Sequence, residues 1–250
     1  MKARLIKRKY DVIACIVLFL IIAAFFSRLF YPNTSFFIVP EYNGSDTTNF
    51  NIPIKMILSQ SYKAGEIPLW NKNLGTGFPL LAETQIGYFF LPNIILYSLF
   101  SFSVAYNLGY VASFMFAAFG MYAYMRYKKF SESISVFAAF TFSFSGFYLG
   151  HMNHYNMLQS ASLFPWLILL FDRFKEKLTV PRLLIFSLVL SQQIFAGHVQ
   201  TTFITLCTIA VLSVFDYILP INRTLKRTPI RWYPLSTHNF DVNLPYCCNL

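Results

Sequence analysis

The feature that most constrains the fold of this chain is a series of apolar runs that approach the length of a membrane-crossing helix. Such a helix takes roughly 20 predominantly apolar residues. The runs cover residues 11–30, 104–125, 133–150, 156–172, 183–197 and 199–219. Only 12% of all residues are charged, whereas a soluble domain carries about 25%. The sequence therefore predicts an all-α polytopic membrane protein located in the cell membrane.

The Lys and Arg residues indicate how the chain is threaded. A seventh apolar stretch, 86–102, is short and contains Pro92 and Asn93. If it does not cross the membrane and the N-terminus is cytoplasmic, sixteen of the 20 basic residues lie on the cytoplasmic side. If it crosses, only the five that precede the first run do. The positive-inside rule favours the first arrangement, so we expect about six transmembrane helices and an interfacial or re-entrant helix within 86–102.

The net charge of +10 raises the question of a nucleic-acid partner. The basic residues are not gathered on one soluble segment. They separate the apolar runs, as loop charges do in membrane proteins. We therefore expect membrane lipids, and no nucleic acid, around this chain. Its Cys residues show no CxxC pair and no Cys/His spacing typical of a zinc site.

The chain is predicted to contain two regions. Residues 1–220 are expected to form the N-terminal part of a transmembrane domain, with a long outer loop at 31–103 that contains interfacial helices. Segment 221–250 differs, because it has three Pro residues and no apolar run. We expect this tail to be irregular and poorly ordered, as in a truncated or frameshifted chain end.

Asp46 is the most prominent acidic residue of the outer loop, because it follows a Gly-Ser turn shortly after the first apolar run. A carboxylate there can act as a general base that deprotonates an acceptor hydroxyl, and nearby lipid would raise its pKa. The position also suits a helix N-cap, since Ser45 or Asp46 precedes a helix expected over 47–62. Spacing alone favours the cap.

The outer stretch 65–93 (GEIPLWNKNLGTGFPLLAETQIGYFFLPN) is rich in Gly, Pro and Asn and yet apolar. We expect a turn-rich loop packed at the membrane surface, with Trp70 at the interface. Trp70, Asn71, Glu83 and Gln85 are candidates to line a sugar or phosphate site. The alternative is that they satisfy backbone hydrogen bonds of the loop.

Two short turns on the same outer side carry further polar residues. His151 and His154 lie in one turn, and His198 and Gln200 lie in the other. The HxxH spacing leaves a divalent metal open, although no flanking carboxylate completes a ligand set. Phosphate binding through imidazole and amide side chains is a second interpretation. Interfacial hydrogen bonding at the helix ends is a third.

Five motifs, in order along residues 1–220, resemble those of the bacterial YfhO-type membrane proteins, whose architecture is related to the GT-C glycosyltransferases. They are GSD at 44–46, the stretch 65–93, GMYAYMRY at 120–127, FTFSFSGFYLGHMNH at 140–154 and QQIFAGHVQTTF at 192–203. The pattern PLWN…G.GFPL…Q…F..PN within 65–93 is the most specific of them.

The resemblance implies a GT-C-like fold and a glycosyltransferase activity. Such an enzyme takes a sugar from a polyprenyl-phosphate carrier and attaches it to a cell-envelope acceptor, such as teichoic acid, on the outer face. An acidic residue in the first outer loop is its usual catalytic base, and Asp46 matches that position, which favours catalysis over capping. Family members are longer than this chain. An inactive fragment, or a non-catalytic transport or assembly module, is therefore the alternative.

Overall fold

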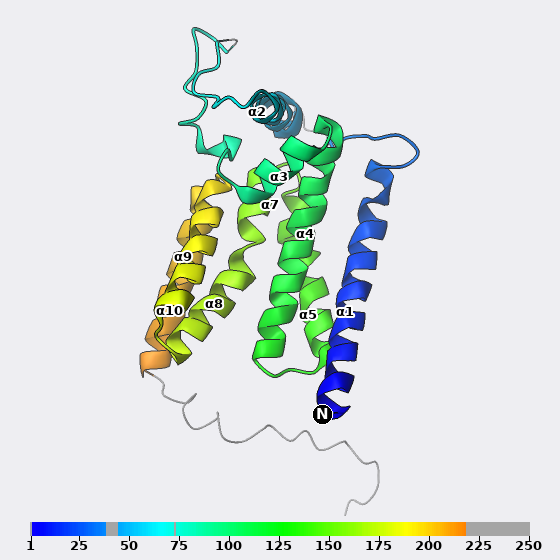
Figure 1. The fold of residues 1–250 in the computed structure, drawn as a ribbon, viewed down its shortest axis with the longest axis vertical. Coiled ribbons are helices and arrows are strands. Elements are labelled where there is room, and N and C mark those ends of the chain that lie inside the picture. The colour runs from blue at the N-terminus through cyan, green and yellow to red at the C-terminus, as the bar shows by residue number, and fades with distance from the viewer. Residues whose placement is uncertain (1, 39–44, 73, 219–250) are drawn as a thin grey trace, which may run out of the picture. The chain divides into compact units, whose positions relative to one another are not determined.

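The computed structural model describes residues 2–38, 45–72 and 74–218 (Figure 1). The predicted tail at 221–250 lies outside these residues. The chain divides into two units, residues 1–209 and 210–250, and all contacts below belong to the first. In the second, residues 210–218 continue the last helix.

The regular elements of the described residues are all helices, with no β-strand among them, which confirms the predicted all-α class. The long and short helices follow in chain order. They are α1 (Lys2–Phe26), η1 (Ser27–Leu29), η2 (Thr47–Asn51), α2 (Ile52–Ala64), η3 (Thr84–Ile86), α3 (Leu91–Leu99), α4 (Phe102–Tyr127), α5 (Glu132–Ser143), α6 (Gly146–Gly150), α7 (Tyr155–Ala161), α8 (Phe164–Glu176), α9 (Val180–Phe195) and α10 (Val199–Ile218).

Within the described part of the chain, three helical segments are long and apolar enough to cross a membrane. They are Lys9–Leu29, Phe102–Tyr127 and Glu132–Gly150. The apolar helix α9 and the apolar part of α10 are shorter. The predicted run 156–172 is two helices, because the chain turns between Ala161 and Phe164 and Pro165 occupies the first turn of α8, a position that tolerates its missing N–H.

Helix α3 agrees with the expectation that 86–102 does not cross the membrane. Its nine residues give a length of about 14 Å at 1.5 Å per residue. The hydrocarbon core of a bilayer is about 30 Å thick. This segment is therefore too short to span.

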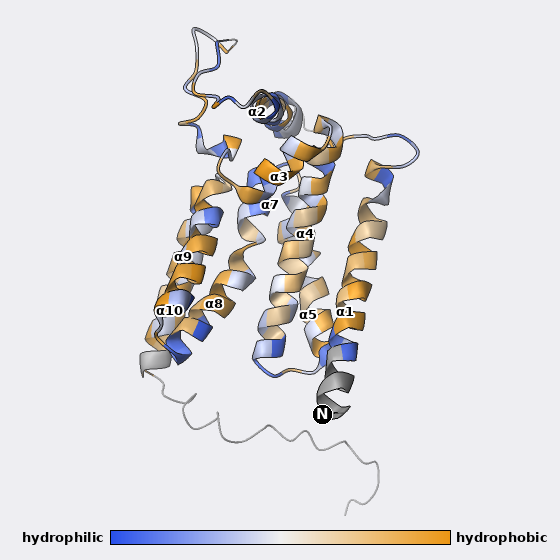
Figure 2. Cartoon of the chain, in the orientation of Figure 1, coloured by the Kyte–Doolittle hydropathy of each residue, from blue (hydrophilic) through white to orange (hydrophobic). Residues whose placement is uncertain are grey.

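One end of the first unit, here called the basic end, holds the start of α1 and the turns that join α4 to α5 and α8 to α9 (Figure 1). Ion pairs connect these elements. Arg126 lies 2.8 Å from Asp11 and 2.5 Å from Glu132, and Lys128 lies 2.5 Å from Asp172. Figure 2 shows hydrophilic residues at this end and mostly hydrophobic residues along the helices above it.

The opposite end, here called the polar end, holds α2, α3 and the turns 151–154 and 196–198. Helix α2 lies across this end, because Figure 1 shows it almost along its axis while α1 and α4 run vertically. It buries Ile54 and Leu58 and exposes Met56. This arrangement is typical of an interfacial helix.

Aromatic side chains form the core beneath the polar end. The rings of Tyr106 and Tyr155 stack with centroids 4.6 Å apart. This contact needs Gly109 on α4, since a Cβ atom there would lie 1.7 Å from the Tyr155 hydroxyl. Tyr110 donates a hydrogen bond to the Met152 carbonyl at 2.9 Å. Helix α4 therefore fixes both the start of α7 and the turn that precedes it.

Candidate functional site

The start of η2 shows which side chain caps this helix. The Ser45 hydroxyl accepts a hydrogen bond from the Thr47 N–H at 3.2 Å, and the Ser45 carbonyl accepts from the N–H groups of Thr48 and Asn49 at 2.9 Å each. The Asp46 side chain makes no capping hydrogen bond. Ser45 is therefore the residue whose side chain caps this π-helical turn, and the Asp46 carboxylate is left for other contacts.

The same turn is tied to the turn between α6 and α7. Asn51 donates from Nδ2 to the Asn153 carbonyl at 3.0 Å, and the Thr47 hydroxyl donates to the same carbonyl at 3.4 Å. These bonds bring Asp46 to His154, with Oδ2 and Nε2 3.6 Å apart. The separation is longer than a hydrogen bond of about 2.7–3.2 Å, so the carboxylate keeps room for a further donor.

Asp46 and His154 lie at a cavity of about 380 Å³ at the polar end. The cavity joins the loop before α2, the turn before α3, the start of α7 and the turn between α9 and α10. Its lining includes six of the residues that the sequence suggested for a site: Asp46, Glu83, Gln85, His154, His198 and Gln200. Six further side chains lie among them: Phe50, Asn51, Thr84, Asn156, Met157 and Val199.

Three predicted site residues do not line this cavity. Trp70 is 55% exposed and covers Gly77, and Asn71 pairs through its backbone with Phe78 in an isolated bridge. His151 bonds through Nδ1 to the Phe147 carbonyl at 2.8 Å, and its ring lies 5.7 Å from that of His154. The structure therefore does not bring these three residues to the cavity.

Gly197 brings the turn before α10 against the turn before α3. Its φ of +90° lies in the left-handed region, which favours Gly. A Cβ atom at this position would lie 2.3 Å from the Thr84 carbonyl oxygen and 2.7 Å from the Gln85 Cα. The close approach places the turn that carries His198 beside the turn that carries Gln85, and both residues line the cavity.

His198 presents a hydrogen-bond donor at the start of α10. The Thr201 N–H donates to its Nδ1 at 3.3 Å, so in the neutral ring the proton lies on Nε2. Burial lowers the pKa of His198, and the nearby His154 and His151 add to that effect. A neutral donor beside a helix N-terminus suits an anionic group such as phosphate.

Lys55 is a residue of this site that sequence reasoning missed. Its side chain is 0% exposed and donates from Nζ to the carbonyls of Gln85 at 3.0 Å and Ile86 at 2.8 Å. The ammonium also lies 5.4 Å from the centre of the Tyr155 ring. Lys55 shares a helical face with Ile54 and Leu58, which is a weak signal, because lysines on such faces usually extend to solvent.

The burial of Lys55 predicts a pH-dependent stability. Burial lowers the pKa of its ammonium from 10.5 to about 7. The unfolded chain then binds more protons between these values, so stability rises as the pH increases from 7 toward 10.5. We expect the melting temperature of the protein in detergent to rise by about 5 °C between pH 7 and pH 9 through this group.

The matched variant is Lys55→Met, which keeps a long unbranched side chain and removes the titrating group. Its melting temperature should change less over this pH range than that of the parent chain. Parallel pH profiles of the two proteins would assign the effect to other groups.

Two polar atoms at the cavity have no hydrogen-bond partner among the described residues. They are His154 Nδ1 and Asn156 Oδ1, and both are buried. A buried polar atom without a partner costs about 1–3 kcal/mol. Such atoms beside a cavity favour a ligand that supplies the missing partners.

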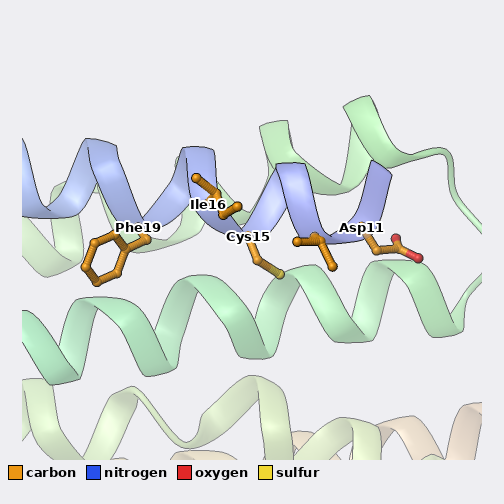
Figure 3. Close-up of a pocket in the computed structure, with 5 residues that line it drawn as sticks. Asp11, Cys15, Ile16 and Phe19 are labelled. Atoms are coloured by element: carbon orange, nitrogen blue, oxygen red, sulfur yellow. The ribbon is translucent and has the colours of Figure 1, made fainter. Parts of the chain in front are cut away.

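A second cavity, of about 370 Å³, lies along α1 (Figure 3). Apart from Asp11, its lining is apolar: Val12, Cys15, Ile16 and Phe19. The Asp11 carboxylate is engaged at 2.6 Å by the Tyr122 hydroxyl, in addition to Arg126. This surface suits contact with lipid chains better than chemistry.

The described residues contain no group of three or more His, Cys, Asp or Glu side chains placed to hold a metal ion. The described residues form an all-helical structure with three helical segments long and apolar enough to cross a membrane and a polar cavity at one end. Comparison with protein-family models, with curated proteins and with solved structures gives no match.

Proposed function

We propose that this chain is a GT-C-like membrane glycosyltransferase. It transfers a sugar from a polyprenyl-phosphate carrier to a cell-envelope acceptor, such as teichoic acid, on the outer face of the membrane. The observation that carries the proposal is the Asp46 carboxylate beside His154, at the mouth of a polar cavity that also holds His198 and Gln200. The resemblance to YfhO-type proteins supports the same activity.

In this mechanism Asp46 accepts the proton of the acceptor hydroxyl. The hydroxyl oxygen then bonds to the anomeric carbon while the bond from that carbon to the phosphate oxygen breaks. The sugar carbon is inverted, and the polyprenyl phosphate leaves as an anion. The His198 Nε2–H, the Gln200 amide and the N-terminus of α10 stabilise the negative charge of the leaving phosphate.

We further propose that the basic end faces the cytoplasm and the polar end faces outward. The Lys and Arg residues at the turns of the basic end support this orientation. The chain then crosses the membrane six times, through α1, α4, α5 with α6, α7 with α8, α9 and α10. An impermeant thiol reagent that modified a Lys129→Cys variant from the outside would contradict it.

The break between α7 and α8 favours a second candidate, a transport module, because transporters use interrupted helices near the membrane midplane. Buried polar groups lie near this break. However, Gln193 donates to the Ser160 carbonyl and to the Thr205 hydroxyl at 3.0 Å each. These two bonds tie α9 to α7 and α10 beside the break, so we favour transfer at the outer cavity over passage through the helices.

The test is sugar transfer by the purified chain in vesicles. Radiolabelled short-chain polyprenyl-phosphate glucose, galactose and N-acetylglucosamine are supplied with teichoic acid, and labelled polymer is collected. We expect transfer from one of these donors. Uptake of a donor or free sugar into the vesicles without transfer would support the transport module, and absence of both binding and transfer would reject the enzyme.

A further inference from the structure

Asn156 carries one of the two buried cavity atoms that have no hydrogen-bond partner among the described residues. Its side chain is 3% exposed and it lines the cavity beside His154. Its Nδ2 donates to the Gln85 carbonyl at 2.7 Å, whereas its Oδ1 has no partner among the described residues. Buried polar atoms are nearly always paired, so this oxygen points to a ligand group that completes it.

The orientation of this amide follows from its partner. A carbonyl oxygen only accepts hydrogen bonds, so the Asn156 nitrogen must face the Gln85 carbonyl and the oxygen must face away from it. The Gln85 carbonyl is itself held by Lys55, which also holds Ile86. Asn93 donates to the next carbonyl, that of Gly87, at 3.0 Å. Three successive carbonyls of this turn are thus fixed, and the direction of the Asn156 oxygen is set before a ligand arrives.

The missing partner of the Asn156 oxygen must be a hydrogen-bond donor. An amide oxygen accepts a hydrogen bond and cannot donate one, so it binds a hydroxyl or an N–H and repels the oxygens of a phosphate. The donors His198 and Gln200 line the same cavity from the start of α10, whereas Asn156 belongs to α7. The cavity therefore offers a hydroxyl-binding position and a separate anion-binding position, which matches a sugar joined to a phosphate.

We propose that Asn156 determines sugar specificity by accepting a hydrogen bond from one hydroxyl of the donor sugar, and that Lys55 is the positioning residue that fixes its orientation. This inference rests on the proposed function, since it concerns how that site recognises its sugar substrate. Asn156 takes no part in the chemical step.

The test pairs protein variants with donor analogues that each lack one sugar hydroxyl. The donor is the polyprenyl-phosphate hexose that the wild-type chain transfers, and KM is measured for the parent and each analogue. In the wild type we expect one analogue to have a KM about tenfold higher than that of the parent donor, because loss of one hydrogen bond to a buried acceptor has about this effect. In Asn156→Ala the KM of the parent donor should rise by a similar factor, and the KM of the same analogue should rise no further.

Two further variants keep the outcome interpretable. Asn49→Ala, an exposed amide of η2 outside the cavity lining, should retain the wild-type ratio between analogue and parent. Lys55→Met, which leaves Asn156 in place but removes the residue that orients it, should lower the ratio of analogue KM to parent KM toward one. Melting temperatures of all variants identify any that fail to fold, and Asn156→Ser, which retains a small polar group, replaces Asn156→Ala in that case.

Equal ratios in the wild type and the Asn156 variants for every analogue would overturn the inference while leaving transfer itself established. If the wild type neither binds nor transfers any donor, the proposed function fails instead. The two failures are therefore distinguishable in one set of measurements.

Discussion

Replacing Asp46 with Asn is expected to reduce sugar transfer by roughly 10²–10⁴-fold, the usual contribution of a general base. The amide keeps the size of the side chain but cannot take the proton of the acceptor hydroxyl. Since Ser45 and not Asp46 caps η2, the variant should fold normally. Its KM for the donor should change little, because the loss falls on the chemical step. Initial rates with radiolabelled donor in vesicles measure both quantities.

The control for this variant is Glu66→Gln, which removes a carboxylate from an exposed position of the same loop outside the cavity lining. It should transfer sugar at the wild-type rate. Glu83→Gln is the informative comparison, because Glu83 is the other carboxylate that lines this cavity. Full activity of Asp46→Asn, together with loss of activity in Glu83→Gln, would assign the base to Glu83 and reject the mechanism.

Replacing Gly197 with Ala is expected to lower both stability and transfer. The positive φ costs a residue with a Cβ atom about 1–2 kcal/mol, and the overlap with the Thr84 carbonyl adds about 1–3 kcal/mol. The free energy of unfolding should therefore fall by about 2–5 kcal/mol in total. Relief of the overlap moves His198 and Gln200 away from Gln85, and misplaced groups reduce the rate by tenfold or more.

Gly150→Ala is the matched control, since a Cβ atom there would meet nothing within 4 Å. Its melting temperature and transfer rate should stay close to those of the wild type. A Gly197→Ala variant that kept the parent's melting temperature and activity would show that the two turns are not in contact as described.

The sequence predicted that the chain is helical and that its polar turns lie on the same side. It did not predict the contacts between these turns. Apolar runs and loop charges were sufficient to group the loop after α1 with the turns at 151–154 and 196–198. The meeting of Asp46 and His154 depends on the bond between Asn51 and Asn153, residues 102 positions apart. No local pattern encodes a pairing over that distance.

Two features escaped prediction for physical reasons. Lys55 is buried, which is rare for a lysine and is compensated here by backbone carbonyls that a sequence pattern does not reveal. The break before α8 had a local signal in Pro165, but the length and mostly apolar composition of 156–172 masked it. The sequence also suggested Trp70 and Asn71 for the same site as Gln85, whereas neither lines the cavity.

Protection of a cysteine in the cavity from modification tests the central claim most directly. The four native Cys residues are replaced, and single Gln200→Cys and Glu66→Cys variants in vesicles of known orientation are treated with an impermeant maleimide. Our account predicts that both are modified from the outside, and that the polyprenyl-phosphate hexose protects position 200 but not position 66. Modification of position 200 only from the cytoplasmic side, or modification that no donor slows, would contradict it.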